Sequence, residues 1–173
     1  MNGTTHSNTT AWLLSFVVFF ALGSIVLGTV WPENIPPQPI RFNHAVHVSN
    51  GLTCEDCHAG ALTREKATLP QLDTCLTCHS EAVTTKPEEE KVRVFARAGR
   101  EIPWVQLTRV PEHVYFSHRR HTALGGLKCA ECHGPMESYT EPPRRAFRRM
   151  KMDDCIECHK QRKASYDCND CHR

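Results

Sequence analysis

Five copies of Cys-x-x-Cys-His run through this chain and take up all ten of its cysteines. The paired cysteines are Cys54 and Cys57, Cys75 and Cys78, Cys129 and Cys132, Cys155 and Cys158, and Cys168 and Cys171. The histidines that close the motifs are His58, His79, His133, His159 and His172. Each motif places two thiols and one imidazole within five residues, so the chain must fold around five binding segments of one kind.

This motif is typical of the covalent attachment of c-type haem. The two thiols add to the two vinyl groups of one porphyrin, and the histidine ligates the iron. Structural zinc sites, redox dithiols and disulfide frameworks also use closely spaced cysteines. None of these needs a histidine directly after every second cysteine, and a disulfide framework tolerates scattered spacings. The repetition therefore predicts five covalently bound haem c groups.

The chain is short for five such cofactors. It has 173 residues, and once the first 31 are set aside roughly 28 remain for each motif, too few for an ordinary apolar core. We therefore expect a multihaem cytochrome c fold with little regular secondary structure and short helices around stacked haems. The apoprotein should be largely unfolded. The formal net charge is +2, and the arginine-rich stretches 144–149 and 119–120 would offset haem propionates, meet an acidic partner or face solvent.

A membrane segment is predicted ahead of the motifs. Residues 11–31 are uncharged and mostly apolar, and as a helix they are long enough to cross a hydrocarbon core of about 30 Å. A cleaved secretory signal is the alternative, but no lysine or arginine precedes the run. We expect a transmembrane anchor in contact with the bilayer, preceded by an inner-side tail at 1–10 and followed by a Pro-rich spacer at 32–41.

The predicted location follows from the haem chemistry. Covalent haem attachment takes place on the outer side of a bacterial-type membrane, so the residues after the anchor should lie there. The expectation is a single-pass protein of the bacterial inner (cytoplasmic) membrane, with its haem domain on the periplasmic side.

An internal repeat divides the rest of the chain. Residues 42–47 and 116–121 both read Phe-x-His-x-x-His, and each precedes a Cys-x-x-Cys-His motif. A second motif closes each unit, which predicts dihaem modules at 42–80 and 113–160. An inter-module insertion at 81–112 separates them, and a C-terminal segment at 161–173 carries the fifth motif.

Five histidines remain when His6 and the motif histidines are set aside, namely His44, His47, His113, His118 and His121. A low-spin electron-transfer haem needs a second axial ligand, and the number of spare histidines equals the number of motifs. We predict that these five are the distal ligands. His113 lies outside the repeat, and Met152 is the first alternative to it, because a thioether can also ligate haem and raises its potential. Spacing alone does not say which distal ligand serves which haem.

The insertion contains a charged stretch and a hydrophobic one. Residues 86–91 are mostly charged and predict a solvated loop. Residues 102–107 alternate in hydrophobicity much as a strand does. Covering a haem edge and docking on a partner subunit are both uses for this second stretch, and for Trp104 packing on a haem is the favoured interpretation.

Two stretches resemble a known family. Cys54 to His79 (CEDCHAGALTREKATLPQLDTCLTCH) and Trp104 to Gly134 (WVQLTRVPEHVYFSHRRHTALGGLKCAECHG) are similar to the membrane-anchored pentahaem cytochrome subunit of alternative complex III. The family often has a histidine a few residues after the tryptophan, and this chain does not. The close fourth and fifth motifs and the short ending are instead similar to small multihaem cytochromes of the c3/c7 type.

The resemblance implies electron transfer and no catalytic residues of the chain's own. Electrons would pass from a quinol-oxidising complex through the haems to a periplasmic monohaem cytochrome c or a terminal oxidase. The implied partners are iron–sulfur, molybdopterin-enzyme-like and polytopic quinol-site subunits, and nucleic acid is not among them. The alternatives are a donor to a photosynthetic reaction centre or a periplasmic reductase, a multihaem reductase with one open haem, and a cytochrome that polymerises into conductive filaments.

Overall fold

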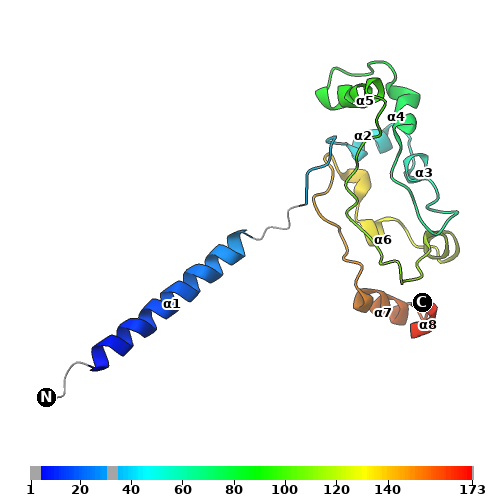
Figure 1. Ribbon diagram of the computed structural model, residues 1–173. Helices are drawn as coiled ribbons and strands as arrows, with labels where there is room; N and C mark the ends of the chain where they lie inside the picture. Colours follow the sequence, from blue (N-terminus) through cyan, green and yellow to red (C-terminus); the bar gives the residue numbers. More distant parts are fainter. Residues whose placement is uncertain (1–4, 31–34, 173) are drawn as a thin grey trace. The chain divides into compact units, whose positions relative to one another are not determined.

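A computed structural model describes residues 5–30 and 35–172 of the chain, with side chains described from residue 11 to 25 in the first range (Figure 1). Two compact units divide near residue 36. The first contains helix α1 (Thr5–Val30), and large apolar side chains from Trp12 to Ile25 are exposed on it. Within the described ranges no helix is long and apolar enough to cross a membrane. The transmembrane anchor expected at 11–31 is therefore not found, and Trp31, residues 1–4 and the spacer residues 32–34 lie outside the description.

The second unit is built from short helical segments joined by long connections (Figure 1). They are α2 (His44–Ser49), α3 (Cys54–Cys57), α4 (Leu72–His79), α5 (Pro87–Arg97), η1 (Arg120–Leu124), α6 (Ala130–His133), η2 (Met136–Ser138), α7 (Met152–Gln161) and α8 (Cys168–Cys171). Apart from an isolated bridge between Val114 and His172, residues 35–172 contain no β-structure. The expected fold of short helices with little other regular secondary structure is confirmed to that extent.

Local sequence explains why such short helices form. An isolated helix this short is unstable in water, so its ends need partners. Asn43 caps α2 by accepting a hydrogen bond from the Val46 amide at 2.9 Å. Thr53 and Asp56 form a capping box at the start of α3, which satisfies backbone donors that the first helical turn leaves free.

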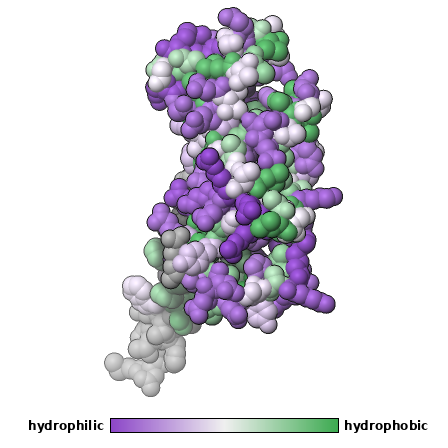
Figure 2. All heavy atoms as spheres, turned by 90° about the vertical axis from the view of Figure 1, so that its right-hand side faces the viewer, coloured by the Kyte–Doolittle hydropathy of each residue, from purple (hydrophilic) through white to green (hydrophobic). Residues whose placement is uncertain are grey.

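The hydrophobic core of the second unit is small and lies where α4 packs on α5. Its buried members are Ile40, Leu72, Val92 and Ile102. Partly buried residues around them include Phe95 and Trp104. Elsewhere many apolar side chains are exposed, among them Val46, Leu69 and Leu124. Figure 2 shows one face of the molecule, where hydrophilic side chains cover most of the surface and hydrophobic ones appear in small groups.

The insertion differs from its expected form. The stretch predicted as a solvated loop forms the start of helix α5. Pro87 is the first residue of this helix, glutamates occupy its first turn and Arg97 lies in its last turn. This arrangement suits both the fixed φ of proline and the helix dipole. The alternating stretch at 102–107 forms no strand. Instead it places Ile102 in the core, and the Trp104 indole donates a hydrogen bond to the Pro70 carbonyl at 2.9 Å.

Candidate haem-binding site

Each cysteine pair lies on or at the start of a short helix. All ten cysteines fall within the described residues and none of them forms a disulfide; each pair has one exposed and one partly buried member. Residues three apart lie on the same side of a helix. Both thiols of a motif therefore face one side, as attachment to the two vinyl groups of one porphyrin requires.

Four motif histidines face a spare histidine across a similar gap. The ring centroids are 6.1 Å apart for His47 and His79, 6.4 Å for His118 and His133, 6.0 Å for His121 and His159, and 5.7 Å for His113 and His172. The fifth motif histidine, His58, neighbours His44: burial first, and then the imidazoles of His58 and His47, lower the pKa of His44. Four motif histidines thus face one spare histidine each, and His58 interacts with His44.

These separations fit an iron between two imidazoles. Metal–imidazole bonds of about 2.0 Å, and about 1.1 Å from a ring nitrogen to the centre of a five-membered ring, place two trans rings about 6.2 Å apart. The four centroid distances lie within about 0.5 Å of that value. The interplanar angles run from 6° to 66°, which axial ligation permits because each ring can turn about its own metal–nitrogen bond. The residues present therefore fit bis-histidine haem.

Backbone carbonyls fix the orientation of several of these rings. The Nδ1 atom donates to a carbonyl oxygen at 2.7 Å in His47 and His121 and at 3.0 Å in His58. His159 makes the same contact with Ser165. Because a carbonyl only accepts, Nδ1 carries the hydrogen and Nε2 keeps the lone pair that a metal needs.

A phenylalanine supports the spare histidines in both modules. Phe42 stacks on His47 with centroids 4.3 Å apart and meets His44 edge-on at 4.8 Å. Phe116 stacks on His121 at 4.7 Å and meets His118 edge-on at 4.9 Å. The repeated phenylalanine was visible in the sequence, but its role as a support for both rings is apparent only in the structure.

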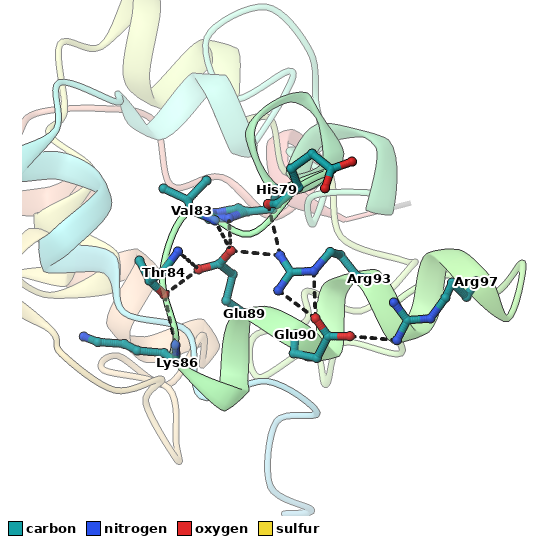
Figure 3. A network of polar contacts seen from close by, with 9 residues as sticks. His79, Val83, Thr84, Lys86, Glu89, Glu90, Arg93 and Arg97 are labelled. Carbon is teal, nitrogen blue, oxygen red and sulfur yellow. Dashed lines mark hydrogen bonds and ion pairs between the residues drawn. The ribbon is translucent and has the colours of Figure 1, made fainter.

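Glu89 is a site residue that sequence reasoning missed. Its side chain is only 7% exposed and accepts hydrogen bonds from the Val83 and Thr84 amides and from Arg93 (Figure 3). Hydrogen bonds from Thr84, Arg93 and Val83 hold the pKa of this carboxyl well below its usual range. Its Oε1 lies 3.5 Å from Nδ1 of His79. Nothing in the charged run 86–91 distinguished this glutamate from its neighbours.

Interactions between thiols show which motifs are neighbours in space. Cys54 and Cys129 share a thiol hydrogen bond, which after burial is among the causes that raise the pKa of Cys54. Burial raises the pKa of Cys75, and the nearby thiol of Cys57 raises it further. Burial, then Asp154 and then Cys171 raise the pKa of Cys155. After burial, Arg148 lowers and Cys158 raises the pKa of Cys132. The motifs are numbered 1 to 5 in chain order. Motif 1 therefore lies near motifs 2 and 3, motif 3 lies near motif 4, and motif 4 lies near motif 5.

Backbone contacts join further segments of the haem-bearing unit. The His118 amide donates to the Glu65 carbonyl at 2.9 Å, and the Arg119 amide donates to the Arg64 carbonyl at 3.0 Å. These bonds hold the start of module 2 against the segment that follows motif 1. The Tyr115 amide donates to the Cys171 carbonyl at 2.8 Å, which ties motif 5 to the same segment.

Among the candidate ligands, Met152 stands apart. Its side chain is 60% exposed at the first residue of α7. His113, the ligand for which it was the alternative, is the residue that faces His172.

The short helices and five attachment segments define a multihaem c-type cytochrome, and comparison with known proteins agrees. Residues 46–135 match the family described as cytochrome c3, and residues 114–173 match cytochrome c7 and related cytochrome c. The first match covers more than half of the chain, so the chain belongs to the cytochrome c3 family. It is an electron-transfer protein with covalently bound haem c.

One relative adds a physiological context. The chain is 38% identical over 98 residues to a protein of Nitratidesulfovibrio vulgaris named menaquinone reductase, multiheme cytochrome c subunit. The match covers 56% of this chain and 45% of that relative, so the chain spans less than half of the relative's length. The resemblance to c3/c7-type cytochromes is confirmed, whereas membership of alternative complex III is not shown.

Proposed function

We propose that the chain is a pentahaem electron relay in which every haem has two histidine ligands. The observation that carries this proposal is the pairing of four motif histidines with one spare histidine each, and the interaction of His58 with His44 completes the set. In this assignment His44, His47, His118, His121 and His113 serve motifs 1, 2, 3, 4 and 5. When bound, haem supplies one-electron redox chemistry. The chain's residues attach, ligate and orient the groups, and with both axial positions taken no open site is left for a substrate.

The partner we propose is a quinone-linked complex of the bacterial cytoplasmic membrane, with the haem-bearing unit on the periplasmic side. The printed name of the relative, a subunit of a menaquinone reductase, supports a quinone partner. Electrons would then pass from a periplasmic donor toward menaquinone through iron–sulfur, molybdopterin-enzyme-like and polytopic quinone-site subunits. This direction is opposite to the one that the resemblance to alternative complex III implies, while the link to quinone is the same.

The haem content is tested on the purified full chain. Pyridine haemochrome analysis and intact mass should give five haems per chain, and the oxidised protein should show only low-spin ferric signals in electron paramagnetic resonance. Changing His121 to alanine should convert one haem to high spin, while Arg119→Ala, which alters an exposed residue of the same segment, should leave all five low-spin. Four haems, or a fully low-spin H121A protein, would contradict the assignment.

The partner is tested on native membranes. Gentle detergent extraction, a haem-stained native gel and mass spectrometry of the stained band should find this chain with an iron–sulfur subunit and a polytopic membrane subunit. The extracted complex should reduce a menaquinone analogue when a reduced periplasmic cytochrome is supplied. A band that holds this chain alone, or a reaction centre, would reject the quinone complex and leave the haem assignment unaffected.

A further inference from the structure

His79 differs from two other motif histidines, His58 and His159, in the partner of its Nδ1 atom. In His58 and His159 that atom donates to a neutral backbone carbonyl. In His79 it is buried and makes no hydrogen bond of normal length. The acceptor that faces it is the carboxylate of Glu89, at 3.5 Å (Figure 3).

We propose that Glu89 is a positioning residue that sets the reduction potential of the haem on motif 2 by acting through His79. This inference rests on the proposed function, because it requires His79 to ligate iron through Nε2. The hydrogen of a neutral ring ligated in this way is on Nδ1 and points to Glu89. A carboxylate next to that hydrogen raises the basicity of the ligand and favours the more positive ferric state.

The surroundings of Glu89 keep its charge and its position. Oε1 accepts from the Val83 amide at 2.7 Å and from Arg93 at 2.8 Å, and Oε2 accepts from the Thr84 amide at 2.7 Å. A carboxylate with this many donors stays ionised and holds one rotamer. The side chain is only 7% exposed, so water screens its effect on His79 very little.

Arg93 opposes Glu89 within the same network. Its side chain is 14% exposed, bonds to Glu89 at 2.8 Å and also pairs with Glu90 at 2.7 Å. A buried guanidinium next to the carboxylate cancels part of the negative potential at His79. Removing Glu89 should therefore favour ferrous iron, and removing Arg93 should favour ferric iron, although both changes break the same ion pair.

This opposition provides the test. In Glu89→Gln, potentiometric titration of the holoprotein followed by electron paramagnetic resonance should raise the midpoint of one haem so that its ferric-to-ferrous ratio at fixed potential falls about tenfold. That corresponds to about 59 mV for a one-electron couple. The same haem should move in the negative direction in Arg93→Met. Glu90→Gln is the matched control, because Glu90 contacts Arg93 and Arg97 but not His79, and all five midpoints should stay in place.

The outcomes separate this inference from the proposed function. A shift of the same sign in E89Q and R93M would show loosened packing and overturn the role of Glu89. Unchanged midpoints in both variants, with five low-spin haems retained, would also overturn the role of Glu89. If E89Q fails to incorporate its haem, R93M alone decides by the direction of its shift. Loss of haem count or low-spin ligation in the unaltered chain would instead reject the proposed bis-histidine ligation.

Discussion

At the residue scale, Phe116 is expected to hold two haem ligands at once. Its ring stacks on His121 and meets His118 edge-on, and aromatic contacts of this kind contribute about 1 kcal/mol beyond simple burial. Phe116→Leu keeps an apolar side chain and removes the ring. We expect a high-spin fraction at two haems in electron paramagnetic resonance and a stability loss of about 1 kcal/mol in denaturant.

The control for that variant is Thr63→Ala, in an exposed turn of the loop after motif 1, which should change neither measurement. A fully low-spin F116L protein of unchanged stability would show that the histidines need no aromatic support.

The sequence indicated which histidines to consider as ligands, but it did not indicate how they would be paired. The motifs, the repeated Phe-x-His-x-x-His and the equal counts predicted the histidines that now face one another. Which ring faces which depends on contacts between segments far apart in the chain, as in His47 with His79. Glu89 had no signal, because a buried carboxylate and a solvated one look alike within a charged run.

At the scale of elements, α4 depends on a residue outside it. Its first turn needs hydrogen-bond acceptors, and the Leu72 amide donates to the Glu101 carboxylate at 2.8 Å. Glu101→Ala should therefore lower the free energy of unfolding by about 1 kcal/mol, as for the loss of an N-cap. Urea unfolding followed by circular dichroism would measure this. The exposed Glu112→Ala serves as control, and equal stability of the two variants would show that α4 does not need this cap.

Secondary structure in the insertion was the least predictable part of the fold. The charges at 86–91 favoured a loop, yet the order of those charges, with acidic residues first and Arg97 last, also suits a helix. What decides between them is the burial of Val92 in the core with Leu72 and Ile102. That contact joins three separate segments, and no local pattern encodes it.

At the scale of the whole molecule, the polypeptide has little core of its own. Four buried apolar residues form its central cluster, and a chain of this size normally needs far more burial to offset its conformational entropy. The full chain produced without haem attachment should therefore lack a cooperative unfolding transition and most of its far-ultraviolet helical signal. A cooperative transition with helix content equal to that of the holoprotein would show that the wrapping folds by itself.

The arrangement of motifs makes a prediction about the order of electron transfer. A thiol hydrogen bond links motif 1 to motif 3, and electrostatic interactions between thiols link motif 1 to 2, motif 3 to 4 and motif 4 to 5. We therefore expect the haems to be arranged in the order 2, 1, 3, 4, 5, which differs from their order in the sequence. Charges repel more strongly at shorter distance, so oxidation of the haem on motif 3 should raise the midpoint of the motif 1 haem more than that of the motif 2 haem.

Nuclear magnetic resonance can measure these pairwise interactions, because each haem has separate methyl signals during a redox titration. Two ligand changes would assign the signals: His47→Met marks the haem on motif 2, and His118→Met marks the haem on motif 3, since a thioether ligand raises the potential of its own haem. A stronger interaction between motifs 2 and 3 than between 1 and 3 would support a route in sequence order. The reverse would support the order in which the haem on motif 1 lies between those on motifs 2 and 3.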